Sequence, residues 1–243
     1  MSPTLTGSEA PRLRRALGGT NPLSRHPRAY LFLARRRYGS RVLGPDTDIV
    51  IEGFPRSANT FAVTAFELAQ ERPVTVAHHL HAAAHVVRAA QAGVPVIVLV
   101  RAPEDAIASV VARKPSLDPA AAAAAYLRFY EGVAGVLDAC VVAEFRQVVD
   151  DFGGVIERTN RAYGTTFTPF EHTDENVRRC FDRIEAQNRD RSAGRLVESS
   201  VARPSDERAR QAEAARGRVE SLPADVRSRL ARVYDATVER ATP

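Results

Sequence analysis

The sequence predicts an α/β protein with three layers, in which a mostly parallel central sheet is flanked by helices and followed by a helical C-terminal region. Two observations carry this prediction. Short runs of Val, Ile and Leu alternate along the chain with longer segments of helical periodicity, which is the pattern of strand–helix–strand units. From Asp174 onward the pattern is helix, loop and charge alone. A length of 243 residues suits one such domain.

Four short apolar segments are expected to be strands buried within the sheet. The clearest is Pro95–Val100, an unbroken Val/Ile/Leu run of the kind found inside parallel sheets. Because consecutive parallel strands need crossover helices, the sheet edge at their carboxyl ends is where a ligand is expected. The expected strands are Thr47–Gly53, Pro73–Ala77, Pro95–Val100 and Val141–Phe145.

Helical periodicity fills the segments between these strands. The alanine run Ala120–Ala125 fits a packed helix, because alanine is the best helix former. A short basic helix is also expected over Pro27–Tyr38, with Tyr30, Phe32 and Leu33 turned inward. The other expected helices are Thr60–Glu71, His79–Ala92 with its stop at Gly93, Glu104–Arg113, Pro119–Ala139 and Gly154–Tyr163.

Composition indicates a globular protein of a reducing cytoplasm. Hydrophobic residues make up 44% of the chain and charged residues 26%, and no apolar run reaches the roughly 20 residues of a membrane helix. Met1–Leu17 has scattered arginines and no apolar signal core. Two cysteines are too few for a disulfide framework or a cysteine zinc site.

Positive charge is concentrated at the N-terminus. Residues 1–45 hold nine arginines against Glu9 alone, so this arm carries +8 while the whole chain carries +5. We therefore divide the chain into a basic arm with a short helix, residues 1–45, and a single α/β domain, residues 46–243. A nucleic-acid partner is not expected, because no aromatic–basic interleaving accompanies the charge. Peripheral contact of the arm with a membrane stays open.

A candidate anion-binding loop follows the first expected strand. Gly53-Phe-Pro-Arg-Ser-Ala-Asn-Thr60 fits the frame of the phosphate loop G-x-x-x-x-G-K-[ST], with Ala58 and Asn59 in place of the second glycine and the lysine. The helix start still offers backbone N–H groups to an anion, and Arg56 offers a charge that can form two hydrogen bonds. The alternative is a plain strand–turn–helix with an incidental arginine.

A second candidate anion site follows the third expected strand. Arg101 stands at the end of that strand, and Ser109 comes eight positions later, about two turns into a helix that starts near Pro103. An arginine and a hydroxyl directed at one point suit a second phosphate. The alternative is that Arg101 pairs with Glu104 or Asp105 and that Ser109 is an ordinary helix residue.

Together the two motifs resemble those of the PAPS-dependent sulfotransferase family (PAPS is 3′-phosphoadenosine 5′-phosphosulfate). The first family motif is roughly [YF]-P-[KR]-S-G-[TS]-[TN]-[WF], here Phe54-Pro-Arg-Ser-Ala-Asn-Thr-Phe61. The second is an arginine after the third strand with a serine eight positions later, here Arg101 and Ser109. The resemblance covers about residues 48–167 and implies a P-loop NTPase-like fold.

The resemblance also implies roles for these residues. Arg56 would contact the leaving phosphate and the sulfuryl oxygens, and Phe61 would lie beside the adenine. Arg101 and Ser109 would hold the 3′-phosphate. PAPS would be the co-substrate and PAP (3′,5′-adenosine bisphosphate) the product, with no metal. The residues that would hold the 5′-phosphosulfate are Ser57, Ala58, Asn59 and Thr60.

The chain departs from the family pattern in several places. Ala58 replaces a glycine and so has less conformational freedom. Phe145, near the family's adenine-side tyrosine, lacks a hydroxyl. No clear C-terminal basic-glycine loop is present, and the candidates for closing over the nucleotide are Arg191–Arg195 and Arg203–Arg210.

Four of the six histidines cluster after the second expected strand: His78, His79, His81 and His85. His81 and His85 stand one helical turn apart, but no HExxH glutamate lies between them, so a metal site is not expected. By the resemblance, His79 with Leu80 matches the family's histidine base and its following leucine. His79 is the expected base, with His78 and His81 as runners-up, and Ala77 stands where the family often has a lysine.

The sequence therefore predicts an enzyme that transfers a sulfuryl group from PAPS to a hydroxyl or amine of an unidentified small-molecule, glycan or glycolipid acceptor. Two alternatives stay open. A P-loop small-molecule kinase would want a lysine at position 59 and an aspartate near a strand end for Mg²⁺. A non-catalytic nucleotide-binding module would need no base.

Overall fold

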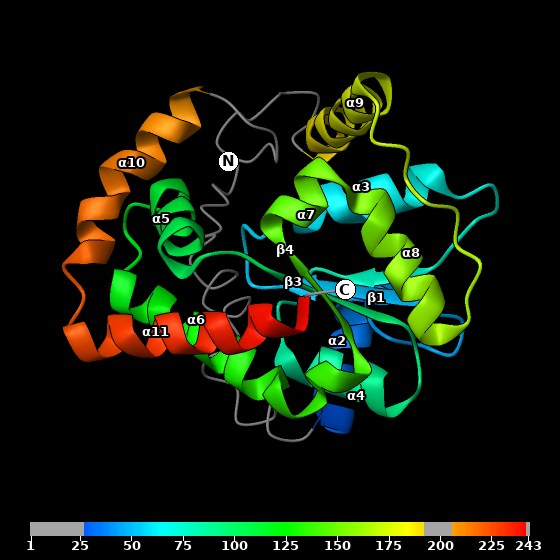
Figure 1. Ribbon diagram of the computed structural model, residues 1–243, viewed down its shortest axis with the longest axis horizontal. Helices are drawn as coiled ribbons and strands as arrows, with labels where there is room; N and C mark the ends of the chain where they lie inside the picture. Colours follow the sequence, from blue (N-terminus) through cyan, green and yellow to red (C-terminus); the bar gives the residue numbers. More distant parts are fainter. Residues whose placement is uncertain (1–26, 192–205, 242–243) are drawn as a thin grey trace, which may run out of the picture.

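The computed structural model describes residues 27–191 and 206–241 (Figure 1). Its sheet has four strands, all parallel, in the order β2-β1-β3-β4. The carboxyl ends of the four strands therefore meet at one edge. This confirms the α/β class with a parallel sheet flanked by helices. The strands are β1 (Ile49–Gly53), β2 (Val76–His78), β3 (Val96–Val100) and β4 (Val141–Glu144).

Alternation along the strands builds the two apolar layers. In β3, Val96, Val98 and Val100 face one layer, whereas Ile97 and Leu99 face the other, and all five are fully buried. This is the two-residue period of a strand covered on both faces. Both faces of the sheet are therefore covered by helices (Figure 1).

One face of the sheet is covered by α3 (Asn59–Ala69), α7 (Phe145–Asp150), α8 (Phe152–Tyr163) and α9 (Asp174–Arg191). The other is covered by α4 (Ala83–Gln91), α5 (Pro103–Arg113), α6 (Pro119–Val133), α10 (Asp206–Glu220) and α11 (Ala224–Val238). Short 3₁₀ turns occupy Gly39–Arg41 (η2), Ala134–Ala139 (η3) and Glu239–Ala241 (η4).

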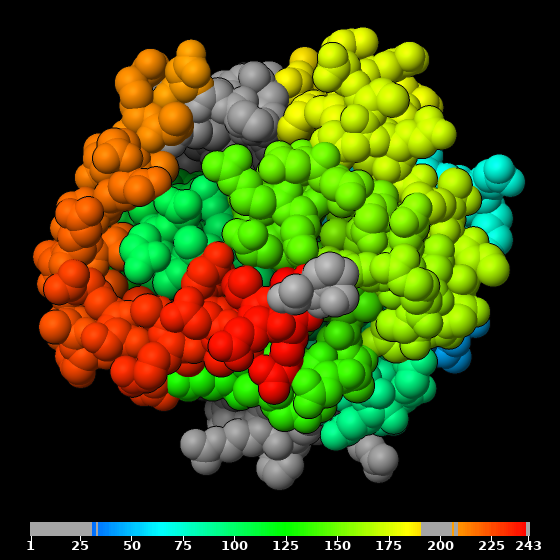
Figure 2. Space-filling view, viewed as in Figure 1, coloured from blue at the N-terminus to red at the C-terminus, as the bar shows by residue number. Residues whose placement is uncertain are grey.

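The C-terminal helices are part of the domain. Ala215 and Val219 of α10 and Leu230 of α11 are buried in the core on the α5–α6 side. In the space-filling view the orange-to-red segment formed by α10 and α11 covers one side of the molecule (Figure 2). Helix α10 thereby comes to lie along α5, the helix that carries Ser109.

Several boundaries differ from the sequence prediction, among them the end of the expected helix Pro119–Ala139, where α6 stops at Val133 and Ala134–Ala139 form η3. Helix α4 begins at Ala83 and not at His79, because His79 and His81 have positive φ angles that no helix accepts. Phe145 opens the short helix α7 and does not end β4. There the side chains of Glu144 and Gln147 form a reciprocal capping box that starts a helix directly after the strand.

The basic helix α2 (Pro27–Tyr38) is confirmed, but Phe32 is not turned inward: it is 63% exposed. Leu31 and Ala34, three residues apart, form the buried stripe and pack with Leu80. Phe32 projects to solvent, where the Arg36 guanidinium lies 5.0 Å from the centre of its ring. The side chains of Tyr30 and Leu33 lie outside the described residues.

No helix in the described part of the chain combines the length and apolar character that crossing a bilayer requires.

Candidate functional site

The loop between β1 and α3 has a backbone of unusual shape. Gly53 closes β1 where a Cβ atom would come within 2.4 Å of the Leu99 carbonyl oxygen, so only glycine fits there. Arg56 has φ 75° and Ala58 has φ 62°, and Ala58 is the N-cap of α3. Ala58 therefore adopts the left-handed conformation that a glycine would favour, at a cost of about 1–2 kcal/mol.

Buried polar atoms without partners gather in this loop. Ser57 is fully buried and Asn59 is 4% exposed. Asn59 donates its Nδ2–H to the Phe54 carbonyl at 3.0 Å, but its Oδ1 has no hydrogen bond within the described residues. Ser57 Oγ lies near the Tyr130 hydroxyl without hydrogen-bond geometry, and it too is unsatisfied within this part of the chain. Buried polar groups are normally paired, so these unpaired atoms mark the loop as a candidate ligand site.

Tyr130 supports the loop from below. Its hydroxyl donates to the Leu99 carbonyl at 2.8 Å and accepts from the Phe54 N–H at 3.4 Å. Burial raises the pKa of Tyr130 far above its usual value, with smaller opposing contributions from hydrogen bonds, so the hydroxyl stays protonated. Tyr130 thus links the end of β3 to the start of the loop.

The two predicted anion-binding motifs meet in space. Arg101 at the end of β3 donates from Nη1 to the Arg56 carbonyl at 3.1 Å. Arg56 in turn donates from Nε to Ser109 Oγ at 2.9 Å. Strand β3 is the direct neighbour of β1, so Arg101 emerges beside the loop that follows β1. Arg56, Arg101 and Ser109 therefore form one connected group at the carboxyl edge of the sheet.

Arg101 is half-buried between an aromatic ring and other cations. Its guanidinium carbon lies 4.2 Å from the centre of the Phe145 ring, so Phe145 stacks on an arginine. Burial lowers the pKa of Arg101; the nearby Asp105 opposes this shift, and Arg216 and Arg146 add to it. Arginine stays charged throughout. An anion would relieve the repulsion among these cations.

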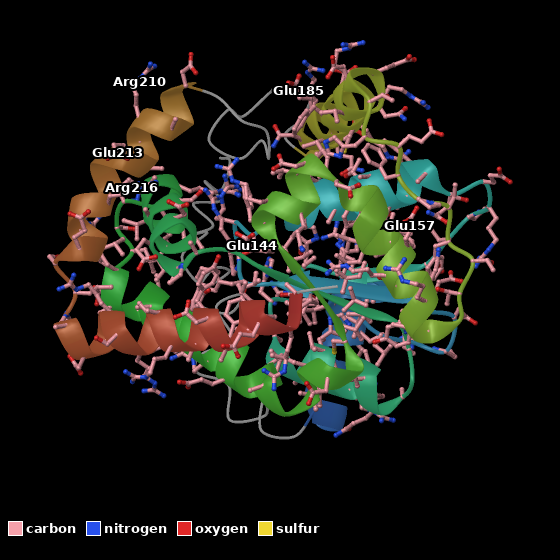
Figure 3. The ribbon with its side chains drawn as sticks, in the orientation of Figure 1. Glu144, Glu157, Glu185, Arg210, Glu213 and Arg216 are labelled. Atoms are coloured by element: carbon pink, nitrogen blue, oxygen red, sulfur yellow. The ribbon has the colours of Figure 1, made fainter. Side chains whose placement is uncertain are left out.

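The alternative pairing of Arg101 with Glu104 or Asp105 is wrong for the described residues. Asp105 instead pairs with Arg216 of α10, with Nη2 and Oδ1 2.6 Å apart. Arg216 also pairs with Glu213 one turn earlier, and both lie on the part of α10 beside α5 in Figure 3. The positive charge of Arg101 thus has no carboxylate partner within salt-bridge distance in the described part of the chain.

The loop after β2 carries the predicted base. His79 Nε2 lies 3.1 Å from Thr60 Oγ1, in the first turn of α3. Its Nδ1 is in close contact with Nδ1 of His78, and the centroids of the His79 and His81 rings are 5.7 Å apart. The loop between β2 and α4, residues 79–82, is called the histidine loop below. It therefore lies directly beside the candidate anion loop between β1 and α3.

Backbone strain is concentrated in these two loops. Arg56, Ala58, His79 and His81 are the non-glycine residues with positive φ among the described residues. Such conformations persist only where the surrounding structure enforces them, and they cluster at functional sites. This strain marks the same edge of the sheet as the unpaired polar atoms do.

Glu52 is a part of the site that the sequence prediction missed. It is fully buried, and its carboxylate accepts the N–H groups of Leu80 at 2.7 Å and His81 at 3.1 Å, and Nδ1–H of His85 at 3.0 Å. Burial alone would raise the pKa of Glu52. The hydrogen bond from His85, the electrostatic attraction of His81 and His85, and the hydrogen bond from the Leu80 N–H together hold this pKa below its ordinary value. A lone glutamate within an apolar strand was the available signal.

The metal interpretation of His81 and His85 lacks its geometry. Only His85 is in α4, and its two ring nitrogens are occupied by Glu52 and by the Leu43 N–H. Within the described residues, no group of three or more His, Cys, Asp or Glu side chains could hold a metal ion.

Phe61 is 6% exposed and packs in an aromatic cluster with Phe170, His172 and Phe181, at centroid distances of 6.1, 6.0 and 5.6 Å. Of the candidate closing segments Arg191–Arg195 and Arg203–Arg210, residues 192–195 and 203–205 lie outside the described residues. Arg210 is described and is exposed on α10 (Figure 3).

Comparison of the chain with protein-family models, with curated proteins and with solved structures finds no match.

Proposed function

We propose that this protein is a sulfotransferase that moves a sulfuryl group from PAPS to a hydroxyl or amine of an acceptor molecule. The observation that supports this most is the chain of contacts from Arg101 to the Arg56 carbonyl and from Arg56 to Ser109. It unites the two motifs on which the family resemblance depends. The unpaired buried atoms of Ser57 and Asn59 support it independently.

The proposal assigns a role to each part of the site. Backbone N–H groups at the start of α3, with Ser57 and Thr60, bind the 5′-phosphosulfate, where the helix dipole favours an anion. Arg101 and Ser109 bind the 3′-phosphate. Arg56, which is already bonded to Ser109, lies between the two and stabilises charge on the transferring group.

The reaction is a displacement at sulfur. The acceptor oxygen forms a bond to sulfur while the bond from sulfur to the phosphate oxygen breaks, and PAP leaves. The acceptor's proton passes to an imidazole, which His79 supplies in the sequence prediction. As in phosphoryl transfer, the protein mainly positions the reactants and stabilises charge.

The geometry favours this reaction over a kinase. Asn59 stands at the place of the kinase lysine. Its neutral amide is buried and donates a hydrogen bond to the Phe54 carbonyl, so this position supplies no cation to a nucleotide. Strand β4 ends in Glu144, but that carboxylate caps α7 and accepts the Tyr234 hydroxyl at 3.2 Å. A carboxylate engaged in this way is poorly placed to bind Mg²⁺.

Ligand-induced thermal shift tests the proposal. PAP at about 100 times its Kd should stabilise the protein by about 2.7 kcal/mol without Mg²⁺, which is about 5–10 °C for a chain of this size. A shift in melting temperature with ATP and Mg²⁺ alone would identify a kinase. No shift with either nucleotide would refute a nucleotide-dependent enzyme.

The acceptor can then be sought with radiolabelled PAPS and fractionated metabolites. Transfer of label to a fraction would identify the acceptor class. Stable PAP binding without transfer to any fraction would favour the non-catalytic module.

A further inference from the structure

The carboxylate of Glu52 has no part in the reaction proposed above, although it lies directly below the site. It is the one acidic side chain that is fully buried among the described residues. Burying a carboxylate is costly unless several hydrogen bonds compensate for the lost water. Its partners all belong to the histidine loop and to the start of α4.

The hydrogen bonds of His85 define its proton positions. Nε2 accepts the Leu43 N–H at 3.0 Å, so this nitrogen carries no proton. Nδ1 must then be protonated, and it donates to Glu52 Oε1. These two hydrogen bonds place the proton of the His85 ring on Nδ1, facing the Glu52 carboxylate.

The same reasoning applies to His81. A carbonyl oxygen can only accept, so the 2.7 Å contact with the Gly53 carbonyl requires a proton on His81 Nδ1. Nδ1 also lies 3.8 Å from Glu52 Oε2, which accepts the backbone N–H of His81. Nε2 has no hydrogen bond to any described residue, and the side chain is 12% exposed. His81 thus keeps Nε2 available as a proton acceptor, and the Glu52 carboxylate lies near the other ring nitrogen, Nδ1.

We propose that Glu52 is a positioning residue that holds His81 as a proton acceptor of the site, with Nδ1 protonated and Nε2 open to the substrate. This inference rests on the proposed transferase. It differs from the sequence prediction, in which His79 is the base. His79 is held against Thr60 of the anion loop and so helps to shape that loop.

The proton balance of the step is simple. When the acceptor oxygen attacks sulfur, its proton passes to His81 Nε2. His81 becomes an imidazolium that still donates from Nδ1 to the Gly53 carbonyl, and the Glu52 carboxylate stabilises the new positive charge. PAP leaves with the electron pair of the broken bond from sulfur to oxygen.

Nuclear magnetic resonance of the histidine ring nitrogens in the full chain tests the arrangement without substrate. At a pH where the rings are neutral, His81 and His85 should both carry their proton on Nδ1. His81→Asn identifies the His81 signal and also serves as a catalytic variant, because an asparagine amide can replace the Nδ1–H donor but not Nε2. A proton found on Nε2 of neutral His81 would overturn the proposal.

Turnover, followed as PAP release from PAPS with water or a simple phenol as acceptor, tests the role. His81→Asn should lower turnover by 10² or more while the Kd of PAP changes less than threefold. His79→Asn should lower it by less than tenfold. The opposite order, with His79 essential and His81 dispensable, would restore His79 as the base and remove the proposal.

Glu52→Gln keeps the size of the side chain and one acceptor oxygen, and should lower turnover about tenfold or more with the Kd of PAP unchanged. Equal turnover in Glu52→Gln and the unmodified protein would show that Glu52 only stabilises the fold. Glu67→Gln removes a partly exposed carboxylate on a different element, α3, and is the matched control. If the unmodified protein binds no PAP, the transferase itself is refuted, and the proton position on His81 alone decides whether the Glu52–His81 pair exists.

Discussion

Replacing Glu52 of β1 by alanine should strongly destabilise the protein. The variant leaves the Leu80 N–H, the His81 N–H and the His85 Nδ1–H without their acceptor in a fully buried place. A buried donor without a partner costs about 1–3 kcal/mol, and breaking a buried charged network typically costs about 3–5 kcal/mol. We expect a loss of about 3–5 kcal/mol in the free energy of unfolding.

Urea unfolding followed by circular dichroism measures this loss, with the slope of the transition as a check that the denatured state is unchanged. Glu67→Ala is the comparison, because that carboxylate is 29% exposed and, among the described residues, its ion pair is with an exposed arginine, Arg183, at 3.5 Å. It should cost less than about 1 kcal/mol. If the loss in Glu52→Ala is as small as that of the control, the buried network does not hold the histidine loop.

Acid dependence gives the same network a second test. The pKa of Glu52 is lowered in the folded protein, so the ionised carboxylate contributes stability above its unfolded value of about 4.5, and this contribution is lost as the pH falls through the folded pKa. The unfolding free energy of the unmodified protein should therefore fall more steeply below pH 4.5 than that of Glu52→Gln. Parallel curves for the two proteins would contradict this assignment.

The remaining predictions concern the loop, the arginine and the basic helix. Ala58→Gly should raise the free energy of unfolding by up to about 1 kcal/mol, because glycine adopts the left-handed conformation without strain, whereas Ala58→Val should lower it. Calorimetry that finds the valine variant more stable than the glycine variant would contradict the left-handed conformation of this residue. Arg101→Met should weaken PAP binding 10–100-fold by calorimetric titration, as expected for loss of a charged hydrogen bond of about 1.5–3 kcal/mol, and an unchanged Kd would exclude Arg101 from the site. On α2, Arg36→Gln should weaken sedimentation with anionic vesicles about fivefold, since each arginine near such a surface contributes roughly 1 kcal/mol, and Phe32→Ser should weaken it further; equal binding to neutral vesicles would argue against an electrostatic membrane contact.

Local pattern was enough for the class of fold and for most of its elements. The Val/Ile/Leu run of β3 and the β-branched run of β1 predict strands because a strand's period is short and its burial in a parallel sheet leaves an apolar run. Helix α5 was anticipated from a start near Pro103 and α6 from its alanine run. The predicted start of α4 was wrong. The N–H groups of Leu80 and His81 donate hydrogen bonds to Glu52, which lies on a strand distant in the sequence, and these bonds hold the two residues in a loop.

The candidate site divides in the same way. The residue types of both anion motifs, and their places at strand ends, are properties of short stretches of sequence, so the sequence alone determined Arg56, Ser57, Arg101 and Ser109 as candidates. Only the tertiary structure decided that β3 lies beside β1, which brings Arg101 to the Arg56 carbonyl and Ser109 to the Arg56 guanidinium. It also decided which nitrogen of His81 stays open, because a ring's proton position follows from its hydrogen-bond partners, and those partners are brought together by folding.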